Sequence, residues 1–173
     1  MSANDFDFLL GSWDIRHRRL RNRLADDPSC DEFTGYSQIR KSFGGLGNFD
    51  ESVLHLPGGT YVGVTIRLYD PKSELWSISW VDSRNPAFDV PMVGRFEGGI
   101  GRFFCDESFN GRPIRVRFLW SQIAATSARW EQAFSTDGGD SWETNWVMDF
   151  TRTAEASQPS SVYETLAVEG VAA

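Results

Sequence analysis

The sequence has 173 residues, of which 40% are apolar, and this is enough for one domain that buries roughly two thirds of its unfolded surface. Its 17 basic and 24 acidic residues give a net charge of −7, which repels nucleic acid and anionic membranes and argues against both as partners. No signal-like apolar segment precedes Trp13 and no run of roughly 18 apolar residues occurs, so we expect a cytoplasmic protein, with Cys30 and Cys105 as reduced thiols.

The first half of the chain reads as a series of strands. Residues 5–10 are long enough for about one helical turn. The alternating run at 13–23 then predicts a strand that carries Trp13, Ile15, His17 and Arg19 on one face. Breaks rich in Gly, Pro and Asp separate the next four predicted strands, which are residues 32–43, 48–56, 61–69 and 75–82.

The second half continues in the same way and ends in a long hairpin. Strands are predicted at residues 92–97, 102–108 and 114–123, and the turn between the last two contains the favourable pair Asn110-Gly111. Two alternating runs within 129–152 flank a glycine-rich reversal. The reversal, Ser-Thr-Asp-Gly-Gly-Asp-Ser-Trp at 135–142, resembles the Asp-box hairpin of sialidases and other β-proteins. In that motif Asp137 would accept local backbone hydrogen bonds, a structural role.

These elements add up to an all-β fold. Nine or ten strands at regular spacing predict a single antiparallel up-and-down β-barrel over residues 1–152, because a long meander leaves two exposed edges unless it closes. The tail at 153–173 has no Lys or Arg and is expected to be disordered or one loosely packed helix.

The start of the chain is similar to proteins of the calycin superfamily, which includes lipocalins, fatty-acid-binding proteins and nitrobindin-like barrels. The resemblance rests on Phe8-Leu9-Leu10-Gly11-Ser12-Trp13. It implies that Trp13 closes the base of the barrel and that an arginine of the last strand packs across it. Arg152 is the matching position here, and stacking of a guanidinium on an indole contributes about 0.5–2 kcal/mol.

A more specific combination of motifs resembles the DUF1579-type bacterial barrel proteins. The motifs are Gly44-Gly45-x-Gly47-Asn48-x-Asp50-Glu51, Arg67-Leu68-Tyr69-Asp70-Pro71, Trp76-Ser77-Ile78-Ser79-Trp80, Val93-Gly94-Arg95-Phe96 and Trp130-Glu131-Gln132-Ala133-Phe134-Ser135. The resemblance spans roughly residues 5–152, and it implies a fold and a pocket rather than a reaction.

Four polar residues are candidates for chemistry in the barrel. His17 and Arg19 share the Trp13 face, where they would bind an anionic or carbonyl group, and His17 could move a proton near neutral pH. Asn48 and Glu51 lie in the glycine-bounded stretch, and a lone carboxylate in an apolar cavity would have a raised pKa and could act as an acid or base. The alternatives for His17 and Arg19 are solvent exposure at the mouth or pairing with interior acids such as Glu51. The alternative for Asn48 and Glu51 is a turn-stabilising Asn/Asp cluster in which Glu51 forms a salt bridge with an arginine.

Arginines and aromatic residues supply the other candidates. Arg67, Arg95 and Arg117 would cradle a carboxylate or phosphate if they pointed inward, and would be ordinary surface residues if they pointed outward. The tryptophans either line a cavity or fill the core, and Gln132 is a polar group on an apolar face. The predicted ligand-binding set is Arg19, Asn48, Arg67, Trp80, Arg95, Trp120, Trp130, Gln132 and Trp146.

Several kinds of site have no signature in the sequence. It has two histidines, His17 and His55, and no HExxH, CxxC, Gly-x-Ser-x-Gly or glycine-rich loop that opens a helix. We therefore expect no metal and no cofactor. Haem is disfavoured as well, because no histidine occurs after position 55 and the late strands therefore offer no histidine as its axial ligand.

We expect a protein that binds a small, largely apolar or aromatic molecule, with a carboxylate or carbonyl group as its polar anchor. One alternative is a cofactor-free isomerase, cyclase or lyase that uses Glu51 or His17 as acid or base. A second is an oligomeric interaction module, such as a homodimer, without a ligand. The alternation cannot say which face of a strand points inward, and a slip of one residue would exchange every assignment.

Overall fold

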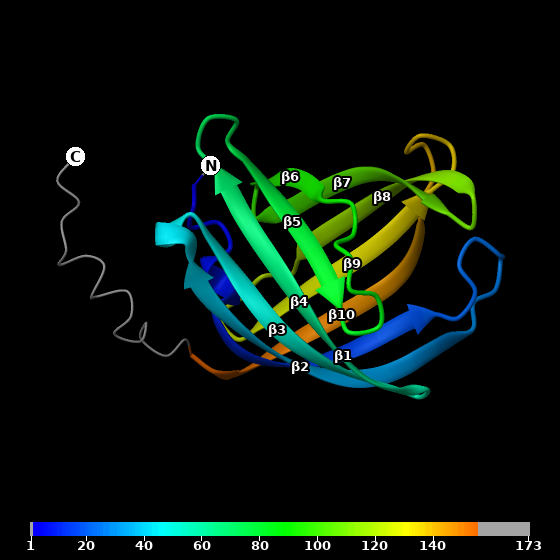
Figure 1. Cartoon of the computed structure of the whole chain (residues 1–173), viewed down its shortest axis with the longest axis horizontal. Helices are drawn as coiled ribbons and strands as arrows, with labels where there is room; N and C mark the ends of the chain where they lie inside the picture. The colour runs from blue at the N-terminus through cyan, green and yellow to red at the C-terminus, as the bar shows by residue number, and fades with distance from the viewer. Residues whose placement is uncertain (1, 156–173) are drawn as a thin grey trace, which may run out of the picture.

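Ten antiparallel strands form a closed barrel in the computed structural model, which describes residues 2–155 (Figure 1). The strands are β1 (Gly11–Leu20), β2 (Cys30–Ser42), β3 (Gly47–Leu56), β4 (Gly59–Asp70), β5 (Leu75–Asp82), β6 (Met92–Glu97), β7 (Ile100–Phe109), β8 (Arg112–Ser121), β9 (Ser127–Ser135) and β10 (Glu143–Ala154). Two short 3₁₀ turns, η1 (Asp7–Leu9) and η2 (Phe43–Gly45), complete the described elements. Each strand pairs with the next, and β10 pairs with β1, so the predicted all-β barrel is confirmed.

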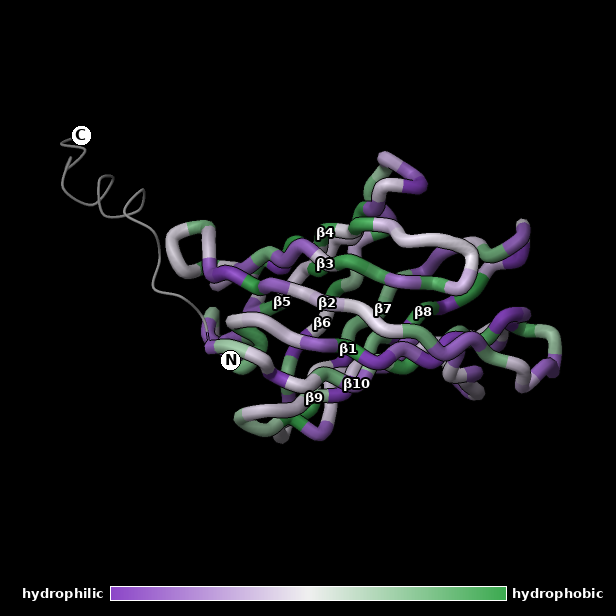
Figure 2. The backbone as a smooth tube through the Cα atoms, turned by 90° about the horizontal axis from the view of Figure 1, so that it is seen from below, coloured by the Kyte–Doolittle hydropathy of each residue, from purple (hydrophilic) through white to green (hydrophobic). Residues whose placement is uncertain are grey.

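Alternation along the strands separates the core from the surface. In β1, Trp13, Ile15 and His17 are buried, whereas Asp14 and Arg16 between them are exposed. Figure 2 shows hydrophilic and hydrophobic residues alternating along the strands, as the period of two requires. The inward face of β1 is thus the Trp13 face, as the calycin resemblance implies.

The first strand ends three residues earlier than predicted. β1 stops at Leu20, and the chain then reverses through Leu24 and Asp26, both at positive φ. The backbone N–H of Leu24 donates to the Glu143 carboxylate at 2.9 Å, which ties this turn to the start of β10. Arg23 therefore lies in the turn rather than on a strand. At the other end of the chain, β10 takes in Thr153 and Ala154, and residues 156–173 of the predicted tail lie outside the described residues.

One end of the barrel is filled by Trp13 and the residues that precede it. The indole N–H of Trp13 donates to the Leu9 carbonyl at 2.7 Å, and the Arg152 guanidinium carbon lies 4.2 Å from the centre of the indole ring. Arg152 also donates to the carbonyls of Phe8, Leu10 and Ala125. This is the contact that the calycin resemblance implies, and it makes this end the closed base.

The β9–β10 turn has the hydrogen bonds expected of an Asp-box hairpin. The Asp137 carboxylate accepts from the Ser135 hydroxyl at 2.6 Å and from the Ser141 backbone N–H at 3.0 Å. The Trp142 indole N–H closes the turn by donating to the Gly139 carbonyl at 2.9 Å. Hydrogen bonds from Ser135 and Ser141 hold the pKa of Asp137 well below its usual range, so the turn keeps its acceptor in acid.

The pairing between neighbouring strands is shortest between β5 and β6. Only three residue pairs join these strands, from Trp76–Gly94 to Ile78–Met92, whereas β3 and β4 share ten. Beyond Ile78 the connection 83–91 runs beside β5, where the Asp89 backbone N–H donates to the Trp80 carbonyl at 2.9 Å (Figure 1). Its Phe88 side chain is 60% exposed.

No helix among residues 2–155 is long and apolar enough to cross a membrane.

Candidate ligand-binding cavity

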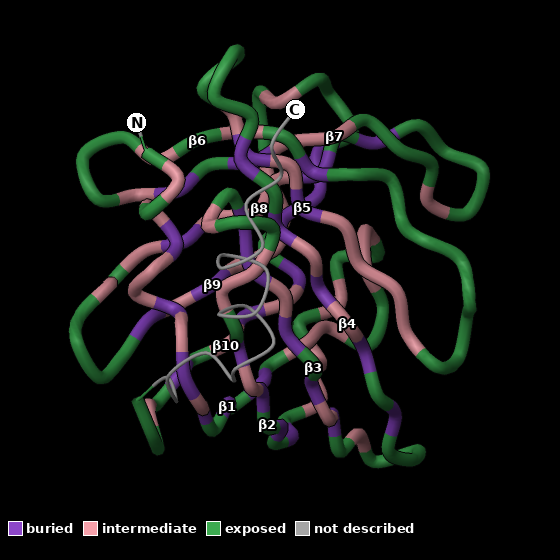
Figure 3. Tube along the Cα trace, turned by 60° about the vertical axis from the view of Figure 1, so that its left-hand side comes forward, coloured by how far each residue is buried: buried purple, intermediate pink, exposed green. Residues whose placement is uncertain are grey.

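A cavity of about 480 Å³ occupies the barrel and extends from Leu9 near the base to Arg23 and Phe109 at the open end. Every strand except β6 contributes more than one lining residue, and the connection 83–91 contributes Arg84, Asn85, Asp89 and Val90. Figure 3 shows that the buried residues lie within the strands and that exposure is concentrated in the turns at the two ends. Because all ten strands contribute to its lining, the cavity is interior to the barrel.

Four tryptophans give the cavity much of its apolar surface: Trp80, Trp120, Trp130 and Trp146. Trp130 and Trp146 lie on neighbouring strands with ring centres 5.6 Å apart and planes at 87°. Trp80 lies against Gly63 so closely that a β-carbon at position 63 would be 2.1 Å from the ring. These contacts fix large aromatic surfaces in place around the cavity, as flat apolar ligands require.

Arg19 is the most unusual charged group of the cavity. Its guanidinium carbon lies 4.7 Å from the centre of the Trp146 ring, and its Nη1 atom is buried without a hydrogen-bond partner. Among residues 2–155 no carboxylate lies within ion-pair distance of it. Burial lowers the pKa of Arg19, and the neighbouring Tyr61 partly opposes this effect. A guanidinium is not deprotonated in proteins, so Arg19 carries a positive charge, and its buried Nη1 donor is unfilled.

Of the other charged groups near the open end, Arg84 and Asp82 form an ion pair. The Arg84 guanidinium donates to the Asp82 carboxylate at 2.7 Å and lies 3.6 Å from the centre of the Tyr61 ring. Burial raises the pKa of Asp89 and of Glu107, and nearby acidic groups add to this shift.

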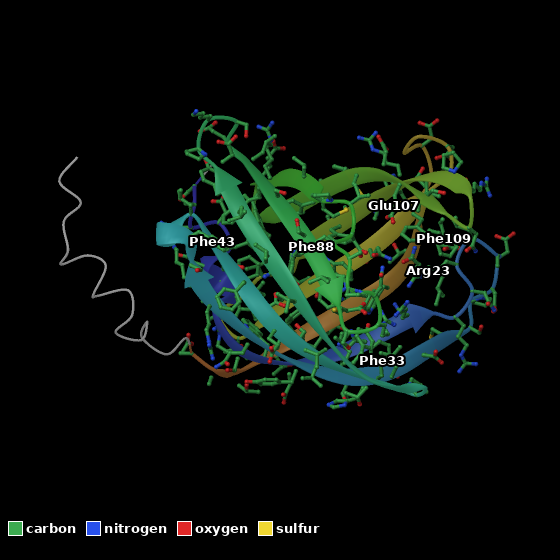
Figure 4. All side chains as sticks on the ribbon, viewed as in Figure 1. Arg23, Phe33, Phe43, Phe88, Glu107 and Phe109 are labelled. Carbon is green, nitrogen blue, oxygen red and sulfur yellow. The ribbon has the colours of Figure 1, made fainter. Side chains whose placement is uncertain are left out.

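Arg23, Glu107 and Phe109 lie together at this end of the barrel (Figure 4). The guanidinium carbon of Arg23 lies 5.5 Å from the centre of the Phe134 ring and 5.9 Å from that of Phe109. Burial lowers the pKa of Arg23 to about 10, so this side chain stays charged at neutral pH. The turn after β1 therefore brings a second cation into the cavity.

His17 faces the interior, but it does not titrate near neutral pH. Its ring stacks on Phe33 with centres 4.5 Å apart, and its Nδ1 accepts from the Trp146 indole N–H at 3.2 Å, so Nε2 carries the proton. Burial, with a contribution from the Arg19 charge, lowers the pKa of His17 to about 3. The imidazole is therefore neutral at pH 7, which corrects the expectation that it moves a proton there.

A second polar group of residues lies deeper, on β2, β3 and β4. The Arg67 guanidinium and the Asp50 carboxylate are 2.7 Å apart, with side chains only 7% and 3% exposed. Thr65 and Ser52 each donate to Asp50 Oδ1 at 3.0 Å, and Arg67 Nη1 donates to the Asn48 amide oxygen at 3.0 Å. This inner ion pair is fully enclosed by the barrel.

The structure brings most of the predicted ligand-binding residues together in the cavity. Those that line it are Arg19, Arg67, Trp80, Trp120, Trp130, Gln132 and Trp146. Gln132 is held by a hydrogen bond from its amide nitrogen to the Asn145 side-chain oxygen, at 2.8 Å. The predicted acid/base candidate His17 also lines the cavity.

Four candidate residues do not line it. One is Arg117, whose guanidinium carbon lies 4.6 Å from the centre of the Trp142 ring. Glu51 is exposed on the outer face of β3, because the inward positions of this strand are Asn48, Asp50 and Ser52. Asn48 is buried but lies behind Arg67, and Arg95 is exposed on β6 beside Glu97. Neither Glu51 nor Arg95 can reach a ligand in the cavity.

Sequence reasoning missed Asp50, Arg23 and Arg84. Asp50 could have been found, because it alternates with Asn48 and Ser52 and the three share one face of a strand. Arg23 and Arg84 lie in connections, where no periodicity indicates direction.

No protein-family model matches this sequence, and no curated protein sequence matches it. Among solved structures, the S-type phycobiliprotein lyase CPES from Guillardia theta is similar, with a TM-score of 0.57 and 12% sequence identity. The match covers 91% of this chain and 95% of that chain. At this identity the likeness shows the fold alone, a β-barrel, and it covers most of this chain.

Proposed function

We propose that this protein binds one small molecule, largely apolar or aromatic, whose carboxylate pairs with Arg19 inside the barrel. The observation that carries the proposal is the Arg19 guanidinium, which lines the cavity, stacks on Trp146 and keeps a buried Nη1 donor without a partner. An unfilled donor of this kind costs free energy until an acceptor reaches it. A ligand carboxylate would supply that acceptor and the opposite charge together.

The surrounding charges favour a singly charged acid over a phosphate. Asp82, Asp89 and Glu107 also line the open end of the cavity. These three carboxylates equal Arg19, Arg23 and Arg84 in number, so the cavity has no surplus positive charge to balance the second negative charge of a phosphate. The apolar remainder of the ligand would lie against Trp80, Trp130 and Trp146.

The two residues named as acid or base of a cofactor-free enzyme are poorly suited to that role. Glu51 is on the outside of the barrel, and His17 is neutral and engaged with Trp146. Binding therefore accounts for more of the cavity's features than catalysis does. Cytoplasmic location, membership of the DUF1579-type proteins and a homodimer remain predictions from the sequence.

The proposal is tested with two matched compounds, 4-(1-naphthyl)butanoic acid and 4-(1-naphthyl)butanol, titrated into the protein by isothermal calorimetry. We expect the acid to bind and the alcohol to bind about 10- to 100-fold more weakly, because a hydrogen bond to a charged group contributes about 1.5–3 kcal/mol.

Two variants test whether Arg19 causes the preference for the acid over the alcohol. Arg19→Met keeps the apolar part of the side chain and should remove the preference for the acid. Arg95→Met removes an arginine from the exposed face of β6 and should leave both affinities unchanged. Equal binding of acid and alcohol to the unmodified protein, or an unchanged preference in Arg19→Met, would contradict the proposal.

A further inference from the structure

The inner ion pair is part of a six-residue polar cluster that the barrel register assembles. Its members face one another in three cross-strand pairs: Ser37 with Ser52, Asp50 with Thr65, and Asn48 with Arg67. We call this set the inner polar cluster. All of its members are at most 9% exposed, and all except Asn48 line the cavity.

The cluster is rigid because its hydrogen bonds converge on one carboxylate. Asp50 Oδ1 accepts from Thr65 and Ser52, and the Ser52 hydroxyl is also 2.9 Å from that of Ser37. Asp50 Oδ2 contacts Arg67 Nη1 at 2.7 Å. Burying an ion pair costs desolvation energy, whereas burying two well-packed apolar residues does not. The presence of the Asp50–Arg67 pair is therefore weak evidence that it serves stability.

The cluster has hydrogen-bonding capacity that the protein does not use. Arg67 Nε is buried without a partner, although the side chain lines the cavity and is 5% exposed as a residue. Asp50 Oδ2 has one described partner, and a carboxylate oxygen can accept two hydrogen bonds. One donor and one acceptor therefore lie on neighbouring groups in the wall of the cavity.

We propose that the inner polar cluster is a second subsite, which binds a neutral group whose hydrogen-bond donor and acceptor atoms are bonded to the same carbon. A lactam or a primary carboxamide has this pattern: its N–H would donate to Asp50 and its carbonyl would accept from Arg67. An ionised group is excluded on electrostatic grounds. It would be attracted by one member of the pair and repelled by the other, while losing its hydration in a buried position.

This subsite lies at the other end of the cavity from Arg19. Arg67 is next to the base, with its guanidinium carbon 5.5 Å from the centre of the Phe6 ring, whereas Arg19 is paired with Trp146 near the open end. The inference rests on the proposed function and narrows it. The ligand class is an elongated aromatic acid with an amide-like head at the end remote from its carboxylate.

The test compares three acids of one length with the unmodified protein. They are naphthalene-butanoic acid, the quinolin-2(1H)-one analogue with the butanoic acid on the ring remote from the lactam, and the N-methyl derivative of that analogue. We expect the lactam acid to bind about tenfold more tightly than the naphthalene acid, and N-methylation to remove the gain by blocking the donor.

Two variants provide a second measurement. Asp50→Asn combined with Arg67→Gln removes both charges at once and avoids a single buried unpaired charge; it should bind the lactam and naphthalene acids with similar affinity. Arg95→Met serves as the surface control and should keep the tenfold preference. If the double variant does not fold, the three-compound comparison decides the question alone.

The outcomes separate the two proposals. Binding of all three acids with equal affinity would overturn the inner subsite and leave the Arg19 site standing. Binding of none of them would overturn both. A preference for the lactam that survives N-methylation would also overturn the inner subsite, because the donor to Asp50 would then play no part.

Discussion

Gly63 marks a place where the cavity wall has no room for a side chain. A β-carbon here would lie 2.1 Å from the six-membered ring of Trp80. We predict that Gly63→Ala displaces Trp80 and lowers the free energy of unfolding by about 1–3 kcal/mol, as overpacking of a core does. Urea denaturation followed by tryptophan fluorescence would measure it. Gly58→Ala is the matched control, because a β-carbon at position 58 meets nothing within 4 Å, and a loss of equal size there would contradict this reading.

His17 gives the stability a dependence on pH. Its pKa is about 3 in the folded protein, against 6.5 for an unperturbed histidine. Between these two values the unfolded chain binds the proton and the folded chain does not, so stability falls as the pH is lowered from about 6.5 towards 3. We predict that His17 contributes about 2 kcal/mol of destabilisation between pH 7 and pH 5.

Urea denaturation at the two pH values checks this prediction with two glutamine variants. His17→Gln should lose this part of the pH dependence. His55→Gln changes an exposed histidine and should keep it. An identical pH dependence in all three proteins would show that His17 does not carry the effect.

At the level of single residues, the sequence predicted chemistry less well than it predicted strands. Asp50 and Glu51 are adjacent carboxylates in one strand, and the motif that contains both does not say which one points inward. The structure places Asp50 in the cavity and Glu51 in solvent, because β3 pairs with β2 and β4 in a register that buries the even-numbered residues. One peptide unit thus decides between a buried ion pair and an ordinary surface acid.

The N-terminal segment and β10 hold the base of the barrel together through Arg152. Its guanidinium donates to three backbone carbonyls and covers Trp13. We predict that Arg152→Met lowers the free energy of unfolding by about 2–4 kcal/mol, because three backbone carbonyls, two of them part-buried, lose their donor and Trp13 loses the guanidinium that covers it. Arg129→Met breaks the surface pair with Asp149 on the neighbouring strands and should cost less than about 1 kcal/mol. Equal losses, measured by chemical denaturation, would contradict the special role of Arg152.

Strands were predictable because alternation and turn chemistry are local. The Asp-box turn at 135–142 and the Asn110-Gly111 turn carry their own signals, and β5 and β6 have the predicted bounds. The end of β1 was not predictable in this way. The alternating pattern continues to Arg23, but the chain turns at Leu20 because Leu24 is bound by Glu143, a residue 119 positions later.

At the scale of the whole molecule, the number of residue pairs between neighbouring strands varies around the barrel. β5 and β6 share three residue pairs, and the connection 83–91 lines the cavity next to that short ladder. We predict that amides of residues 83–97 exchange with deuterium at least about tenfold faster than those of β2 and β3, because few contacts hold this segment. Hydrogen-exchange mass spectrometry would show this, and saturation with naphthalene-butanoic acid should slow exchange there most. Uniform protection around the barrel would exclude this segment as its weak point.

The seam between β1 and β10 has a consequence for the newly made protein. Ser12 pairs with Ala154, so the first strand emerges from the ribosome long before its second partner has been translated. Until then β2 can cover one edge of β1, while the edge that later pairs with β10 is open to a strand edge of another chain, such as a neighbour on the same polysome. Closure of the ring is therefore a late event in biosynthesis, and chaperones that shield strand edges would act in the interval before the last strand is released.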